Sequence, residues 1–196
     1  QLYAPHFNTA ARRYGIPTML HYGDALANNP AMIALLHMLE LARYDFPRRD
    51  VLDVLRSPYF SIPAIDHTLA DRLDAISQEQ QIIGGKEDWL QGVKAAVTAI
   101  TNEDGDSRDA LLTENEAARL EEALTAFFGA VTPPDTATVY EHIDWIEQLI
   151  GSETISNDDD TQFETSPYSL HMVEQISQQT NPDYVGRDMH ALQSLK

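Results

Sequence analysis

The chain has 196 residues and a formal net charge of -18, and 43% of its residues are hydrophobic. This length and composition allow one or two globular domains with a sizeable buried core. The chain contains no cysteine, which excludes disulfides, thiolate metal sites and a cysteine nucleophile. No apolar run approaches the roughly 20 residues that a membrane-spanning helix needs, and no segment has the layout of a secretory signal. We therefore expect a cytoplasmic protein.

The charge is divided unevenly along the sequence. Residues 1–60 contain six arginines and five acidic residues, a net charge of +1, whereas residues 61–196 have a net charge of -19. The phosphates of DNA repel the second part, so any contact with nucleic acid is expected in the first. The candidate DNA-contacting residues are Arg12, Arg13, Arg43, Arg48, Arg49 and Arg56. The alternative is that these arginines are ordinary solvated residues on helix surfaces.

Hydrophobic spacing predicts helices joined by short loops, with little strand. The first helix spans residues 3–14 and ends at Gly15, and the best strand candidate runs from Ile16 to Tyr22. Asn29 can cap the next helix, with Pro30 at its first position, where a missing N–H costs nothing. The apolar stripe expected on that helix consists of Met32, Leu35, Leu36 and Leu39.

Two further helices are expected before a break at Gly84-Gly85. A short helix begins at Phe46-Pro47 and ends at Ser57-Pro58, because the residue before a proline disfavours the helical conformation. A longer helix covers residues 66–78. The inward residues expected on these two helices are Val51, Leu52, Leu55, Leu69, Leu73 and Ile76.

Three more apolar stripes follow the glycine pair. The first consists of Trp89, Val93, Ala96, Val97 and Ile100. A capping box at Thr113 and Glu116 opens a helix whose apolar face consists of Ala117, Leu120, Leu124, Phe127 and Phe128. The third helix ends at Gly151 and carries Val139, Ile143, Ile146 and Leu149.

Polar segments and the C-terminal residues complete the expected organisation. Residues 102–109 form an acidic loop, and residues 152–166, with the run Asp158-Asp159-Asp160, form a mobile loop. A short helix near residues 167–178 precedes Asn181-Pro182 and a last amphipathic helix that continues to the C-terminus. With no initiator methionine and no stop signal after that helix, we expect a fragment of a longer polypeptide.

No pattern in the sequence predicts a catalytic centre. Gly84-Gly85-Lys86 lacks the first glycine and the Ser or Thr of a phosphate-binding loop, which favours a helix start. A calcium loop beginning at Asp104 fails because Asp109 stands where glycine is required, and a solvated loop is favoured for Asp158-Asp159-Asp160. His67 and Asp71, one helical turn apart, are expected to be a surface pair. We therefore expect no catalytic, cofactor-binding or metal-binding residue.

An ordered series of short motifs lies within residues 14–60. Tyr14-Gly15-Ile16-Pro17 is followed by His21-Tyr22-Gly23-Asp24, by Asn29-Pro30 with the helix that it opens, and by the segment from Phe46 to Phe60. This series resembles superfamily I DNA helicases of the UvrD type and the B subunits of AddAB/RexAB-type helicase-nucleases. The resemblance implies that residues 1–60 end a RecA-like domain and pass into an acidic helical insertion domain, residues 61–196.

The expected fold is mainly α, a multi-helix domain with a small α/β fragment at the N-terminus. The expected function is that of a non-catalytic helical module in a helicase-like DNA repair or recombination protein, shaping the DNA path or subunit contacts. The resemblance implies a parent helicase or exonuclease that uses ATP and Mg²⁺, binds DNA and pairs with a helicase-nuclease subunit. Two alternatives are an acidic protein-interaction scaffold with no direct DNA role and a small helical enzyme.

Overall fold

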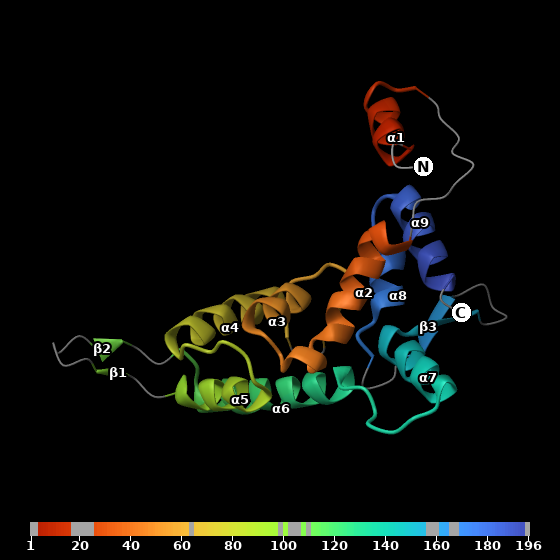
Figure 1. Ribbon diagram of the computed structural model, residues 1–196. Coiled ribbons are helices and arrows are strands. Elements are labelled where there is room, and N and C mark those ends of the chain that lie inside the picture. The colour runs from red at the N-terminus through yellow and green to blue at the C-terminus, as the bar shows by residue number, and fades with distance from the viewer. Residues whose placement is uncertain are drawn as a thin grey trace.

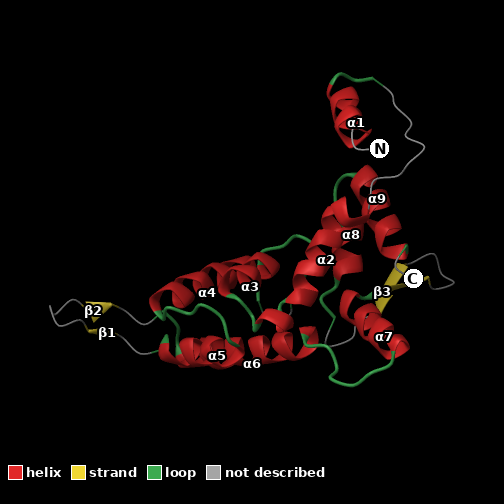
Figure 2. Cartoon of the chain, in the orientation of Figure 1, coloured by secondary structure: helices red, strands yellow, loops and turns green. Residues whose placement is uncertain are grey.

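The structure is a computed structural model that describes residues 4–16, 26–62, 65–97, 100–101, 107–108, 111–155, 161–164 and 169–194. Most of this part is helical, as the hydrophobic spacing predicts (Figure 2). No helix within it is long and apolar enough to cross a membrane. The α-helices are α1 (Ala4–Arg13), α2 (Pro30–Glu40), α3 (Arg48–Leu55), α4 (His67–Glu79), α5 (Lys86–Ala95), α6 (Glu114–Val131), α7 (Val139–Ile150), α8 (Met172–Ser177) and α9 (Pro182–Gln193).

The helices form two groups that meet at α2 (Figure 1). In the first group α3 packs against α4, α4 against α5, and α5 against α6. In the second group α8 packs against α9. Helix α2 contacts both α3 and α9 and therefore joins the groups. Helix α1 lies apart from the others in Figure 1, and the predicted strand from Ile16 to Tyr22 falls, after Ile16, outside the described residues.

Local signals place most helix starts where the sequence predicts them. The side chain of Asn29 accepts hydrogen bonds from the backbone N–H groups of residues 31 and 32, with Pro30 at the first helical position. Thr113 and Glu116 form the predicted capping box of α6. A second capping box, formed by Thr138 and Glu141 at the start of α7, was not predicted. These caps satisfy N–H groups that a helix start leaves without partners.

Two short antiparallel hairpins replace segments that were predicted as helix or loop. Strand β1 (Ile100–Thr101) pairs with β2 (Ser107–Arg108), so the prediction that Ile100 continues the helix is wrong. The helix ends at Ala95, and the carbonyl of the following Ala96 accepts from the N–H groups of Leu111 and Leu112 on the returning chain.

The second hairpin lies in the segment predicted as a mobile loop. Strand β3 (Ser152–Ile155) pairs with β4 (Thr161–Glu164), with Ser152 opposite Glu164 and Ile155 opposite Thr161. The loop prediction relied on polar composition and neglected the strand preference of threonine, isoleucine and phenylalanine in these two stretches. The acidic run at residues 158–160 lies outside the described residues.

The core is organised around Phe46, at the corner between α2 and α3. The indole N–H of the fully buried Trp89 donates to the carbonyl of Phe46 at 3.1 Å, and the ring of Phe46 lies 4.4 Å from that of Phe128. Both Asp45 and Phe46 have left-handed backbones, with φ of 56° and 53°, a conformation that is costly for residues other than glycine. The bonds from α5 therefore hold a strained corner in place.

Gly84 allows the chain before α5 to approach that corner. A Cβ atom at position 84 would lie 3.2 Å from the carbonyl oxygen of Asp45 and 3.3 Å from the Cα of Pro47. Next to it, Gly85 has φ of 96° and donates its N–H to the same carbonyl at 2.6 Å. The prediction that Gly84-Gly85-Lys86 marks a helix start is thus confirmed, because α5 begins at Lys86.

Some predicted core positions instead lie at the surface of α2 and α7. Leu36 is 49% exposed, Ile143 40% and Val139 75%. The stripe on α2 is rotated relative to the prediction, since Met38 is fully buried where Leu36 was expected. The predicted apolar faces of α3 and α6 are buried as expected.

A buried carboxylate joins α9 to the start of α2. Asp188 is fully buried and accepts hydrogen bonds from Asn29 Nδ2 at 3.0 Å and from the Tyr59 hydroxyl at 3.2 Å. The guanidinium of Arg187 donates to both of its oxygens, at 2.7 and 3.1 Å. Burial and the charge of Asp188 raise the pKa of the Tyr59 hydroxyl. One side chain therefore binds its neighbour Arg187 and two groups from distant parts of the sequence, Asn29 and Tyr59.

We expect Asp188→Ala to lower the free energy of unfolding by about 2 kcal/mol, because it leaves the buried amide of Asn29 without its acceptor, whereas the partly exposed Arg187 can turn to water. Urea unfolding followed by circular dichroism measures the change. Asp135→Ala, at an exposed loop position, is the matched control and should change stability by less than about 0.5 kcal/mol. Equal effects of the two substitutions would contradict the assigned role of Asp188.

An ion pair between α4 and α6 should make stability depend on pH. The pKa of Glu116 is lowered from 4.5 to about 2, first by the hydrogen bond from Arg72 and then by the bonds from Thr113. The lowered pKa means that Glu116 contributes stability above pH 4.5, and that this contribution is lost as the pH falls towards 2. Glu116→Gln should therefore be less stable than the wild type at pH 7 and should lose less stability over that interval.

Urea unfolding at a series of pH values measures this difference. Glu122→Gln, an exposed substitution on the same helix, should follow the wild-type pH dependence. If Glu116→Gln also followed it, the coupling between Arg72 and Glu116 would be refuted.

Candidate functional site

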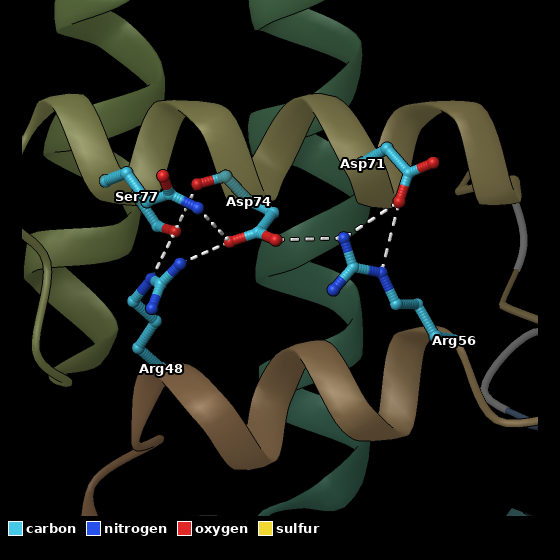
Figure 3. A network of polar contacts seen from close by, with 6 residues as sticks. Arg48, Arg56, Asp71, Asp74 and Ser77 are labelled. Carbon is cyan, nitrogen blue, oxygen red and sulfur yellow. Dashed lines mark hydrogen bonds and ion pairs between the residues drawn. The ribbon is translucent and has the colours of Figure 1, made fainter.

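Two of the predicted DNA-contacting arginines point from α3 towards carboxylates on α4 (Figure 3). Arg56 donates from Nε and Nη2 to Asp71 Oδ1, at 3.1 and 2.8 Å, and from Nη2 to Asp74 Oδ2 at 3.0 Å. Arg48 bonds the other oxygen of Asp74 and donates from Nε to Ser77 Oγ at 2.6 Å. Asp74 therefore lies between the two guanidinium groups and bridges them.

The electrostatics of this α3–α4 network, formed by Arg48, Arg56, Asp71, Asp74 and Ser77, favour an internal role. Its two positive and two negative charges cancel. Burial raises the pKa of Asp74, but hydrogen bonds from Gln78 and Arg56 and the nearby arginine charges outweigh it, so the net pKa is lowered. Hydrogen bonds to Asp71 and Asp74 raise the pKa of Arg56. A neutral cluster attracts phosphate weakly, so these two arginines mainly hold α3 on α4.

The other four candidate arginines are not gathered with this network. Arg49 is 90% exposed and lies 3.8 Å from Asp53, one turn along α3. Arg43 lies over the ring of Tyr44, 5.6 Å from its centroid. Arg13 is exposed on α1, and the side chain of Arg12 lies outside the described part. The exposed cations among the candidates that could meet a phosphate are thus Arg13, Arg43 and Arg49.

A cleft lies beside the network, between α2 and the end of α3. Its volume is about 410 Å³, and Arg56 is the one predicted DNA-contacting residue that lines it. Three hydrogen bonds from Arg56 go to α4 carboxylates, although a guanidinium has five donors. His37 and Tyr59 add polar groups, and Asp53 adds a negative charge. The cleft is therefore lined by both polar and apolar side chains, and it does not gather the positive charge that a phosphate-binding site needs.

The metal and ion-pair candidates of the sequence lie only partly within the described residues. Within them, no three His, Asp or Glu side chains are placed to hold a metal ion. His67 was expected to face Asp71, but its side chain lies outside the described part, and Asp71 pairs with Arg56. The acidic stretch beginning at Asp104 is mostly outside it as well.

The carboxylate partners on α4 were missed when the arginines were considered alone. Asp71, Asp74 and Gln78 recur at spacings of three and four residues, which places them on one face of a helix. That polar stripe, next to an arginine-rich short helix, is the signal that could have identified the network. The buried Asp188 had no such signal, because it stands among the ordinary charged residues of α9.

Comparisons with known protein families, with curated proteins and with solved structures found no match for this chain. Function is therefore inferred from the residues themselves and from their geometry. The arrangement offers exposed cations, apolar hollows and acidic helix faces, which are features of binding surfaces.

Because Asp74 is shared by two arginines, we expect Asp74→Ala to lower the free energy of unfolding by about 1 to 2 kcal/mol. The expected loss is moderate because both arginines are partly exposed to solvent. Asp53→Ala removes a carboxylate whose partner Arg49 is exposed and should cost less than about 0.5 kcal/mol. Chemical unfolding of both variants measures the two losses of stability. A larger loss for Asp53→Ala than for Asp74→Ala would contradict the bridging role of Asp74.

Proposed function

We propose that this chain is a non-catalytic helical module of a helicase-like DNA repair or recombination protein, shaping the DNA path or the contacts between subunits. The observation that carries the proposal is the ordered motif series of residues 14–60, which resembles such proteins. In support, Asn29 caps α2 with Pro30 at its first position, and α3 ends before Ser57-Pro58. This is the order of elements that the resemblance implies.

Under this proposal the catalytic residues belong to other parts of a longer protein, and this chain contributes binding surfaces. A parent helicase or exonuclease would use ATP and Mg²⁺ through residues outside this sequence. The proposed module would contact DNA through its exposed arginines, Arg13, Arg43 and Arg49, and other subunits through its apolar surfaces. The lack of cysteine fits a cytoplasmic location.

A second candidate is an acidic protein-interaction scaffold with no direct DNA role. The specific observation in its favour is that Arg48 and Arg56, two of the six candidate arginines, are neutralised by Asp71 and Asp74. The net charge of -18 also opposes broad contact with DNA. The two candidates differ in whether the three exposed arginines matter for DNA affinity.

Fluorescence anisotropy with a duplex DNA carrying a single-stranded tail, measured over a range of salt concentrations, separates them. Under the first proposal, the combined variant Arg13→Glu, Arg43→Glu and Arg49→Glu should bind DNA more weakly. The slope of log affinity against log salt should fall by about 1 for each phosphate that the variant no longer neutralises. Assays of the pure chain with ATP and Mg²⁺ should show neither ATP hydrolysis nor DNA cleavage.

Arg119→Glu is the control, because it reverses an exposed arginine on the acidic helix α6. It should leave DNA affinity nearly unchanged. If the triple variant also left both affinity and salt dependence unchanged, the scaffold would be favoured. Metal-dependent cleavage of DNA by the pure chain would refute a non-catalytic module.

A further inference from the structure

An apolar groove runs between α2 and α7 and is bordered by Leu192 of α9. Its volume is about 160 Å³. Eight of its nine lining residues are apolar, and the set consists of Met32, Leu35, Leu36, Leu39, Ile143, Ile146, Glu147, Ile150 and Leu192. An apolar cavity of about 150 Å³ stays dry and accepts a benzene molecule. The α2–α7 groove therefore has room for one large apolar side chain.

The groove remains open to solvent along its rim. Leu36 on α2 is 49% exposed and Ile143 on α7 is 40% exposed. One turn earlier on α7, Val139 and Tyr140 are 75% and 81% exposed, which extends the apolar surface along this helix. Exposed apolar side chains that gather around a groove are characteristic of a binding site for another protein.

The helices on both sides of the groove are acidic. Between them, α2 and α7 contain Glu40, Glu141, Asp144 and Glu147 and no lysine or arginine. Glu40 and Asp144 are exposed. A segment with apolar side chains for the groove and positive charge on its sides fits here best, because acidic flanks would be repelled and basic ones attracted.

We propose that the α2–α7 groove binds a basic amphipathic helix of a partner protein. Its apolar residues would recur at i, i+3 or i+4, and i+7, the pattern by which helices fill grooves, with lysine or arginine on the flanks. A second copy of this chain is a poor occupant, because it carries the same acidic helices and a net charge of -18. The inference deepens the proposed function by specifying a partner, and it rests on that function only in assigning subunit contacts to this module.

The direct test uses a fluorescent helical peptide with leucine at the i, i+4 and i+7 positions and lysine on its other faces. A matched peptide with glutamate in place of lysine is the charge control. The lysine peptide should bind the full chain in an anisotropy titration, more weakly as salt is raised, and the glutamate peptide should not. Failure of the lysine peptide to bind, or equal binding of both peptides, would overturn the proposal.

Substitutions locate the binding on the chain. Ile143→Asp should weaken binding of the lysine peptide at least about tenfold, the effect of removing one buried aliphatic side chain from the interface. Ile83→Asp makes the same chemical change at an isoleucine that is 87% exposed and does not line the groove, and it should leave binding unchanged. Equal losses of affinity in the two variants would overturn the assignment to this groove.

A charge exchange provides a second variant that does not alter the apolar surface. The double substitution Glu40→Lys and Asp144→Lys should weaken binding of the lysine peptide and strengthen binding of the glutamate peptide.

Two competing occupants of the groove are tested in parallel. Saturation of the groove by a peptide of residues 4–16, which carries Arg12 and Arg13, would assign it to α1 of this chain. Concentration-dependent dimers disrupted by Ile143→Asp would assign it to a second copy. Either result would overturn the partner proposal.

The groove experiment and the DNA experiment can fail separately. Loss of DNA binding in the triple arginine variant does not depend on Ile143, and peptide binding in the groove does not require Arg13, Arg43 or Arg49. If the chain binds the lysine peptide but not DNA, the groove proposal stands and the proposed DNA contact is refuted.

Discussion

The fold depends on the contact between the corner at Phe46 and the helices α5 and α6. Two adjacent residues there adopt a left-handed backbone that neither would favour alone. The structure maintains this conformation because the indole of Trp89 and the N–H of Gly85 bond the two carbonyls, and the ring of Phe128 covers that of Phe46. Since α2 leaves the corner in one direction and α3 in another, the angle between the two helix groups is determined here. Both helices that leave this corner carry a feature described above, because α2 lines the groove with α7 and α3 carries two arginines of the network with α4.

Charge in this chain has two different uses. Between α3 and α4, opposite charges are paired at hydrogen-bonding distance, so they stabilise the fold and give little field outside it. Along α2 and α7 there is no lysine or arginine, and the exposed carboxylates of Glu40 and Asp144 add negative charge to the two helices that line the groove. An acidic total charge therefore does not imply a uniformly acidic surface. The α3–α4 network is neutral, whereas the helices around the α2–α7 groove are acidic.

Much of the fold could be predicted because its signals are local. A capping residue such as Asn29 or Thr113 acts on N–H groups within three residues, so sequence spacing is enough to identify it. The exposure of Leu36 could not be predicted, because helical spacing shows that an apolar face exists but not which part another helix covers. Likewise, Arg48 was identified as a surface cation because its partners lie on a different helix, and their distance depends on tertiary structure. Residue type suggested the site, and only packing showed which arginines are already paired.

The bond between Asn29 and Asp188 has a consequence for how the chain folds during synthesis. The two residues are 159 positions apart, and the ribosome adds about 5 to 20 residues per second, so the partner of Asn29 emerges roughly 10 to 30 s later. During that interval the cap of α2 has its local bonds, but its amide still faces water. The helices of the first group can assemble meanwhile, because their contacts connect segments that are closer in sequence. The joint between the two groups is therefore among the last parts to be completed, and a nascent chain stalled before α9 would hold α2 against α3 but without its contact to α9.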